Sequence, residues 1–168
     1  MLHLHTWATN HPPMDAPEDL TTRSSGAREH PDHPGWYSWV ELPADSFAAQ
    51  VGTMIFRPDG DGRAVVRMFP TEKHLNLGGS LHGGMVMSFI DMALFGGGRC
   101  AGVARGHYVT LDLTTHFLAR GEPGKPLDCH VELVRQTRSL AFLQGVGRQE
   151  GQACYSFTGT LKKLRDRS

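Results

Sequence analysis

Several features that define other classes of protein are scarce in this sequence. Its 168 residues carry 17 Lys or Arg against 17 Asp or Glu, so the formal net charge is zero with His neutral. A nucleic-acid-binding protein depends on many basic contacts to phosphate, and this balance argues against one. The chain has no apolar run of roughly 18 residues and no basic start followed by an apolar stretch. We therefore expect no nucleic-acid partner, no membrane span and no signal peptide.

Cysteine is also scarce and unpatterned. Cys100, Cys129 and Cys154 form no CxxC or zinc spacing, and their odd number argues against a disulfide framework. A reduced, cytoplasmic protein is the simplest interpretation.

Metal and phosphate sites are not indicated either. The glycine pairs are not followed by Lys-Ser or Lys-Thr, so a Walker-type phosphate loop is excluded. His74, His82 and Asp91 would lie on different helix faces, which disfavours a zinc site. The N-terminal histidines have irregular, proline-interrupted spacing; they are His3, His5, His11, His30 and His33. We expect no metal and no cofactor.

The length predicts a single globular domain, from residue 44 to residue 168, preceded by an N-terminal extension over residues 1–43. Residues 1–35 are rich in His, Pro and acidic residues and show no period that would build a core. We expect the extension to dock on the domain surface through Trp36, Tyr37 and Trp39. All site residues considered below follow Phe69, so we also expect deletion of residues 1–33 to leave the activity nearly intact.

Hydrophobic periodicity predicts an α+β fold with an antiparallel sheet. The expected helices span about 44–50 and 82–96, and the longer one is expected to end at Gly96-Gly97-Gly98. The expected strands span about 51–56, 64–68, 107–118, 127–133, 140–149 and 153–164. In the segment 107–118 residues alternate between apolar and polar, which predicts that Val109, Leu111, Leu113 and Phe117 face the long helix.

An acidic residue lies within the most apolar segment of the chain. Between Met85 and Phe95 only Ser88 and Asp91 are polar, so the helix is expected to be buried on every side. A carboxylate in such a place costs several kcal/mol unless it is paired, which makes Asp91 a candidate general base or nucleophile. The alternative is that Asp91 has only a structural role and hydrogen-bonds to Ser88, one turn earlier.

The run His82-Gly83-Gly84 directly precedes this helix and would leave free backbone N–H groups at its positive end. Such groups suit an oxyanion hole. However, Asp91 lies nine residues beyond His82, about 13 Å along the axis and on the opposite face. One small carbonyl group cannot contact both, so we expect a homodimer in which two antiparallel helices form two shared sites.

The pattern His-x-Asn, Gly-x-x-His-Gly-Gly and an acid nine residues after the second histidine resembles the PaaI-like hotdog-fold acyl-CoA thioesterases, within the 4-hydroxybenzoyl-CoA thioesterase superfamily. The resemblance extends from about Phe47 to Leu164. It implies a sheet wrapped around a long central helix, with the sheets of two subunits joined. It also implies a dimer that can pair into a tetramer.

The resemblance assigns roles to particular residues. Asp91 would be the base or nucleophile, and the amide of Gly83 or Gly84 would bind the oxyanion beside His82. Asn76 would position the thioester or the water, and Thr110 would orient water near the acid. The family draws Asp91 and Thr110 from one subunit and the glycine turn and Asn76 from the other, in agreement with the helix geometry.

The coenzyme A contacts implied by the resemblance are Arg120, Gln136, Arg138, Ser139 and Lys162. Residues 105–168 carry ten Lys or Arg against six acidic residues, which suits a polyphosphate ligand, although ordinary surface charge explains the count equally well. We therefore expect a thioesterase that hydrolyses acyl-CoA to free acid and CoA. Two alternatives stay open: a hotdog acyl-thioester dehydratase or hydratase, and a non-catalytic acyl-CoA-binding regulatory dimer.

Overall fold

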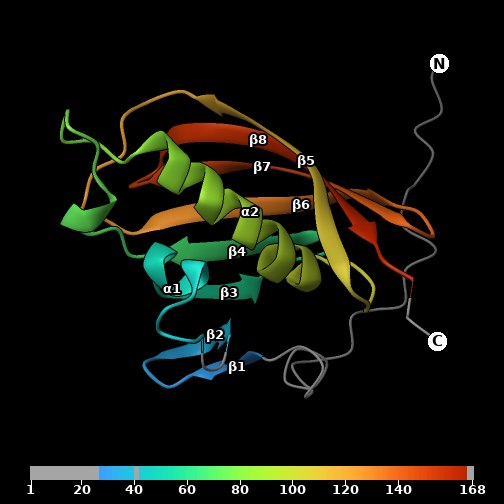
Figure 1. The fold of residues 1–168 in the computed structure, drawn as a ribbon. Coiled ribbons are helices and arrows are strands. Elements are labelled where there is room, and N and C mark those ends of the chain that lie inside the picture. The colour runs from blue at the N-terminus through green and yellow to red at the C-terminus, as the bar shows by residue number, and fades with distance from the viewer. Residues whose placement is uncertain (1–26, 40–41, 166–168) are drawn as a thin grey trace.

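The computed structural model describes residues 27–39 and 42–165. Its main feature is an antiparallel eight-stranded sheet that curves around one long helix, α2 (Gly83–Cys100), as Figure 1 shows. The strands are β1 (Ala27–His30), β2 (His33–Trp39), β3 (Met54–Pro58), β4 (Arg63–Met68), β5 (Tyr108–Phe117), β6 (Leu127–Gln136), β7 (Leu140–Gln149) and β8 (Gln152–Lys163). Their order across the sheet is β1-β2-β3-β4-β6-β7-β8-β5. The predicted α+β architecture is confirmed.

Two short helical elements complete the described fold. Helix α1 (Phe47–Val51) begins after Ser46, whose hydroxyl accepts a hydrogen bond from the Ala49 N–H at 3.2 Å. The 3₁₀ helix η2 (Glu72–His74) lies in the loop between β4 and α2. Among the described residues, no helix is both long and apolar enough to cross a membrane.

The long helix does not end at Gly96-Gly97-Gly98, as the sequence predicted, but continues to Cys100. The three glycines are buried beneath the sheet. A Cβ atom on Gly97 would lie 2.7 Å from Val131 Cγ2 and 2.9 Å from Val66 Cγ2. The glycines therefore permit close approach of helix and sheet, and this packing outweighs their low helix propensity.

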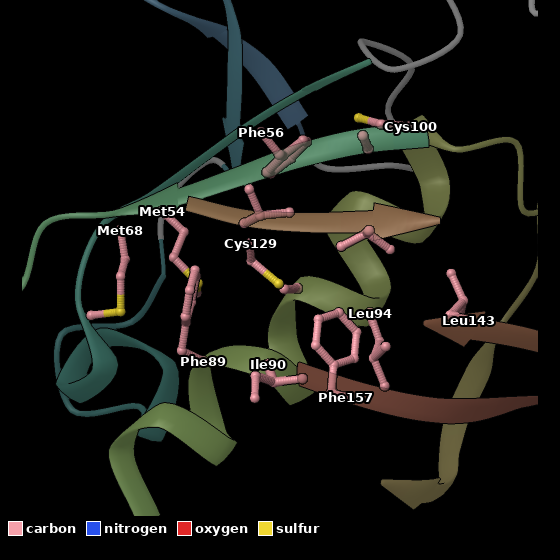
Figure 2. Close-up of a cluster of buried hydrophobic side chains, with 14 of the residues drawn as sticks. Met54, Phe56, Met68, Phe89, Ile90, Leu94, Cys100, Cys129, Leu143 and Phe157 are labelled. Carbon is pink, nitrogen blue, oxygen red and sulfur yellow. The ribbon is translucent and has the colours of Figure 1, made fainter. Parts of the chain in front are cut away.

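The core lies between α2 and the inner face of the sheet. Figure 2 shows Phe89, Ile90 and Leu94 of the helix beside Cys129 and Phe157 of the sheet. All five side chains are buried. Along strand β6 alternate residues point into the core, and Leu127, Cys129 and Val131 are buried.

Strand β5 does not place the predicted residues against the helix. Val109, Leu111 and Phe117 are 42%, 56% and 55% exposed in this chain. The register shifts between Thr110 and Asp112, so that a bulge at Leu111 changes which alternate residues point inward. Tyr108 and Leu113 pack against the core, and the prediction was correct only for Leu113.

The N-terminal extension contributes two strands, which its composition did not predict. Strands β1 and β2 form a hairpin that joins the sheet where Tyr37 pairs with Phe56 of β3. The guanidinium groups of Arg57 and Arg67 lie over the Trp36 ring, at 5.0 and 5.1 Å from its centre. Trp39 packs on Phe56, with 4.9 Å between ring centres. These aromatic contacts agree with the predicted docking through Trp36, Tyr37 and Trp39.

Candidate active site

His82 caps the N-terminus of α2. Its Nδ1 accepts a hydrogen bond from the Gly84 N–H at 3.0 Å, so the ring hydrogen is assigned to Nε2. The amide of Gly83, the first residue of the helix, has no hydrogen bond to any described residue. Of the two glycine amides that the resemblance offered, Gly83 is thus the one that is free to bind an oxyanion.

Asn76 lies in the loop that leads to this cap, and its side chain holds the loop together. Its Oδ1 accepts hydrogen bonds from the N–H groups of Gly78 (2.8 Å) and Ser80 (3.3 Å), and its Nδ2 donates to Ser80 Oγ (3.0 Å). Arg120 supports the same loop because its Nη2 donates to the carbonyl oxygen of Gly78 at 2.8 Å. One Nδ2 hydrogen of Asn76 is left for a ligand.

His74 anchors the start of this loop, a role that the sequence analysis did not assign. The side chain is only 4% exposed; its Nδ1 accepts from the Thr71 N–H at 2.8 Å, and its carbonyl oxygen accepts from the His82 N–H at 2.8 Å. Burial, and secondarily the charge of Lys73, lower the pKa of His74. A histidine eight residues before the capping histidine gives no distinctive sequence signal, so its anchoring role required the structure.

Asp91 lies in the middle of α2 and contacts β5. Thr110 Oγ1 donates a hydrogen bond to Asp91 Oδ1 at 2.6 Å. Ser88 is not its partner, because the Ser88 hydroxyl donates to the carbonyl oxygen of Gly84 within the helix. The predicted neighbourhood of Asp91 and Thr110 is therefore present, and the alternative of a Ser88-satisfied acid is wrong.

The helix is not buried on every side in this chain, contrary to the sequence prediction. Met87 is 40% exposed, and Ser88, Asp91, Met92 and Phe95 are half-buried. The latter four recur at helical spacing and form an incompletely covered face of α2. The carboxylate of Asp91 therefore opens onto a surface that the described chain leaves partly uncovered.

The glycine turn and the acid lie at different ends of β5. The position of a Cβ on Gly83 is 3.3 Å from Cζ of Phe117, the last residue of the strand, whereas Asp91 contacts Thr110 near its start. A cavity of about 400 Å³ lies at the Gly83 end, and Asn76, Gly83, Phe117 and Arg120 line it. Asp91 does not line this cavity.

The residues proposed for coenzyme A fall into two groups. Gln136, Arg138, Ser139 and Lys162 gather around the β6–β7 turn, where Leu140 pairs with Lys162. Gln136 accepts from the Ala104 N–H at 3.0 Å and donates to the Tyr108 hydroxyl at 3.3 Å, so it also ties the start of β5 to this turn. Arg120 lies apart, beyond the other end of β5.

No group of three or more His, Cys, Asp or Glu residues in the described ranges could hold a metal ion. His3, His5 and His11 lie outside those ranges. The three cysteines are free and buried.

The fold, with one sheet wrapped around one long helix, is a hotdog fold. The family model described as "Thioesterase superfamily" matches residues 78–155, which include the glycine turn, Asp91 and Thr110. The phenylacetic acid degradation protein PaaI of Thermus thermophilus, solved as a mutant, is 25% identical, with a TM-score of 0.58 over 66% of this chain and 93% of that chain. A phenylacetic acid degradation-related protein of Ralstonia eutropha is also 25% identical, with a TM-score of 0.61 over 73% and 92% of the two chains. The chain therefore has the hotdog fold of these PaaI-like proteins, and its residues 78–155 are similar to the thioesterase superfamily.

A different likeness comes from curated proteins. Formamidopyrimidine-DNA glycosylase 1 of Mycobacterium tuberculosis is 28% identical over 143 residues, which cover 78% of this chain. The match covers 50% of the length of this relative. The zero net charge lacks the basic excess typical of a DNA-binding surface, so we do not transfer the glycosylase activity to this chain.

Proposed function

We propose that this protein hydrolyses acyl-CoA thioesters to a free acid and CoA, with Asp91 as general base or nucleophile. The observation that carries the proposal is the Asp91 carboxylate, held by Thr110 at 2.6 Å on the incompletely covered face of α2. A carboxylate in this position can take a proton from water or attack the thioester carbonyl directly. The Thr110 hydroxyl fixes the orientation of the carboxylate in either case.

The proposed oxyanion donor is the amide of Gly83, which must come from a second subunit. Within one chain the helix separates Gly83 from Asp91 by eight residues, about 12 Å. An amide donor lowers the barrier only when it lies about 3 Å from the developing oxyanion. A homodimer would supply both groups to one carbonyl.

The exposed edge of β5 supports this homodimer. Strand β5 lies at the end of the sheet and, among the described strands, pairs with β8 alone. It exposes Val109, Leu111 and Phe117, and Leu118 directly after it is 57% exposed. A long apolar edge strand is a template for pairing with another chain unless it is covered. We propose that β5 pairs antiparallel with the same strand of a second copy.

A two-fold axis between Leu113 and Thr114 would bring the two halves of the site together. In an antiparallel pair about that axis, Thr110 lies opposite Phe117 of the partner subunit. Because Phe117 contacts Gly83 and Thr110 contacts Asp91, each acid would meet the glycine turn of the other subunit. Asn76 of the partner subunit would enter the site on the same loop.

The same axis would unite the proposed coenzyme A contacts. Val109 pairs with Lys162 in the sheet and would lie opposite Leu118 of the partner subunit. Arg120 of the partner subunit would then approach Arg138, Ser139 and Lys162. The arginine and lysine side chains among them suit the phosphates of coenzyme A.

Three buried thiols agree with a reducing compartment, and we propose that the enzyme is cytoplasmic.

A panel of acyl-CoA and acyl-carrier-protein thioesters, assayed for thiol release, tests the function. We expect hydrolysis by the wild type and a decrease of at least about a hundredfold in Asp91→Asn, since a general base or nucleophile is lost. Ser88→Ala is the matched control on the same face and should stay within a few fold. Equal turnover by Asp91→Asn and wild type would refute the mechanism, and no release from any thioester would refute the function.

A further inference from the structure

A second cavity lies at the C-terminal end of α2. It shares no lining residue with the cavity beside Gly83. Its volume is about 450 Å³, within the range of small-molecule pockets. Four aromatic side chains from four elements line it: Trp39 of β2, Phe56 of β3, Phe95 of α2 and Tyr108 of β5. Arg105 and His107 also border it, and both are exposed.

Asp91 does not line this cavity, but two of the lining residues are near neighbours of Asp91 and Thr110 along the same elements. Phe95 follows Asp91 by one turn on the same face of the helix, a rise of about 6 Å. Tyr108 precedes Thr110 by two residues, so both side chains point to the same side of β5, about 7 Å apart along the strand. Tyr108 and Thr110 are both half-buried and point inward. The cavity wall therefore starts one helical turn beyond Asp91 on α2 and two residues before Thr110 on β5.

The far wall of the cavity comes from the N-terminal extension. The Trp39 indole packs on Phe56 and lies over Gly96, where a Cβ atom would be 3.0 Å from Trp39 Cη2. Residue 39 lies outside the range 78–155 that matches the thioesterase family model. Ala27 of β1 lines the cavity as well. The extension therefore forms part of a cavity wall, in contrast to the expectation that it only covers the surface.

We propose that this cavity receives the acyl group of the substrate and that Trp39 closes its far end, which restricts the enzyme to compact acyl groups. The proposal rests on the proposed thioesterase function. An aromatic wall suits an aryl or short branched acyl group, because flat rings stack against it with favourable geometry. A long unbranched chain that entered past Phe95 would run into the Trp39 indole.

Removal of the indole should lengthen the accepted chain. We would measure kcat/KM for phenylacetyl-CoA, hexanoyl-CoA and dodecanoyl-CoA in wild type, Trp39→Ala and the milder Trp39→Leu. The ratio of dodecanoyl-CoA to phenylacetyl-CoA should rise at least about tenfold in Trp39→Ala, since several methylene groups gain a place to be buried. Trp39→Leu should shift the ratio in the same direction by less.

Trp36→Ala is the matched control. Trp36 lies on the same strand but contacts Arg57 and Arg67 and does not line the cavity. Its loss tests whether a loosened hairpin alone changes selectivity, and we expect an unchanged ratio. An unchanged ratio in both Trp39 variants, or an equal change in Trp36→Ala, would overturn the proposal.

A binding measurement separates this inference from the proposed function. S-hexyl-CoA and S-dodecyl-CoA are thioethers that no thioesterase can cleave, and their affinities can be compared by calorimetry. Trp39→Ala should improve the affinity for the dodecyl compound relative to the hexyl compound, whether or not any thioester is hydrolysed. If hydrolysis fails but this shift occurs, only the catalytic function is wrong. Absence of binding, or no shift, would overturn the acyl cavity.

Discussion

The two faces of α2 differ in how completely the chain covers them. The face toward the sheet carries Phe89, Ile90, Ala93 and Leu94, all of them 0% exposed, and fits the sheet closely through Gly97. The other face carries Ser88, Asp91, Met92 and Phe95, all half-buried. The first face is covered within one chain, whereas the described chain leaves the second face partly uncovered. The residues that pack the core therefore lie on one side of the helix, and the residue proposed as general base or nucleophile lies on the other.

The largest effect should come from separating the two halves of the proposed shared site. Asp91→Ala and Gly83→Pro should each lose at least about a hundredfold in activity as homodimers. Proline removes the Gly83 N–H, yet the first helical position tolerates it and His82 already has the extended conformation that precedes a proline. Equal mixing should restore about a quarter of wild-type activity, because half of the dimers then carry one intact site. Steady-state kinetics would measure the restored activity, and mass spectrometry would measure the fraction of mixed dimers.

The control for Gly83→Pro is Gly83→Ala, which retains the N–H and adds only a methyl group, 3.3 Å from Cζ of Phe117. It should keep most of the activity. Failure to regain activity in proven heterodimers would mean that each site lies within one chain.

A charge on the β5 edge should weaken the dimer. Leu111→Lys places a cation on the exposed edge strand, which disfavours edge pairing. Sedimentation velocity should show monomers at concentrations where the wild type is dimeric, with activity falling in parallel. Val134→Lys, at a similarly exposed position on the interior strand β6, serves as control. A fully active monomeric Leu111→Lys would contradict the shared site.

Thr110→Val should have a smaller effect. It removes the hydroxyl that donates to Asp91 but keeps the shape of the side chain, and a hydrogen bond to a charged group is worth about 1.5–3 kcal/mol. We expect kcat to fall about tenfold or more, with Tm nearly unchanged. Thr158→Val, at an exposed position of the neighbouring strand β8, should leave both values unchanged. Unaltered kcat in Thr110→Val would show that the hydroxyl does not support catalysis.

The packed face of α2 can be tested through its glycines. Gly97→Ala would force a methyl group to within 2.7 Å of Val131 Cγ2, and such overpacking costs about 1–3 kcal/mol. Gly98→Ala meets its nearest side-chain atoms at 3.3 Å, so better helix propensity should offset much of its strain. Thermal unfolding should therefore rank Gly97→Ala below Gly98→Ala. The opposite order would contradict the packing explanation for the glycine run.

The smallest effect concerns the buried thiols. Burial raises the pKa of Cys100 and of Cys129 to about 12, and it also raises the pKa of Cys154. The thiolate is the reactive form, so dithionitrobenzoate should not react with the native protein at pH 7 to 8 and should react after denaturation. Rapid labelling of the native protein would show that the core opens readily.

The sequence predicted the local features and missed those that depend on packing. The strands predicted over about 140–149 and 153–164 are present, and Glu150 and Gly151 between them take positive φ, the geometry of a tight two-residue turn. The continuation of α2 through Gly96-Gly97-Gly98 was not, since the decisive contacts come from Val66 and Val131 of distant strands. The bulge at Leu111 was also missed, because a one-residue register shift leaves no mark in the alternation.

The candidate site shows the same division. The contact between Asp91 and Thr110 agrees with the resemblance to known thioesterases. The choice of Gly83 over Gly84 required the hydrogen bond from Gly84 to His82, which depends on the cap geometry. The contribution of Trp39 to a cavity was hidden in the extension because a proline-rich composition gave no period for strand β2.

The strand order has a consequence for the biosynthesis of the site. Strand β5 pairs only with β8, the last strand of the described chain. During translation, Asp91 and Thr110 leave the ribosome long before residues 152–163 do, and β5 has no neighbour in the sheet until then. The apolar edge of β5 is therefore unprotected on both sides in the nascent chain. Chaperone binding to nascent chains should concentrate on this interval, and stalling before Gln152 should yield a chain in which the acid and its hydroxyl partner are not yet assembled.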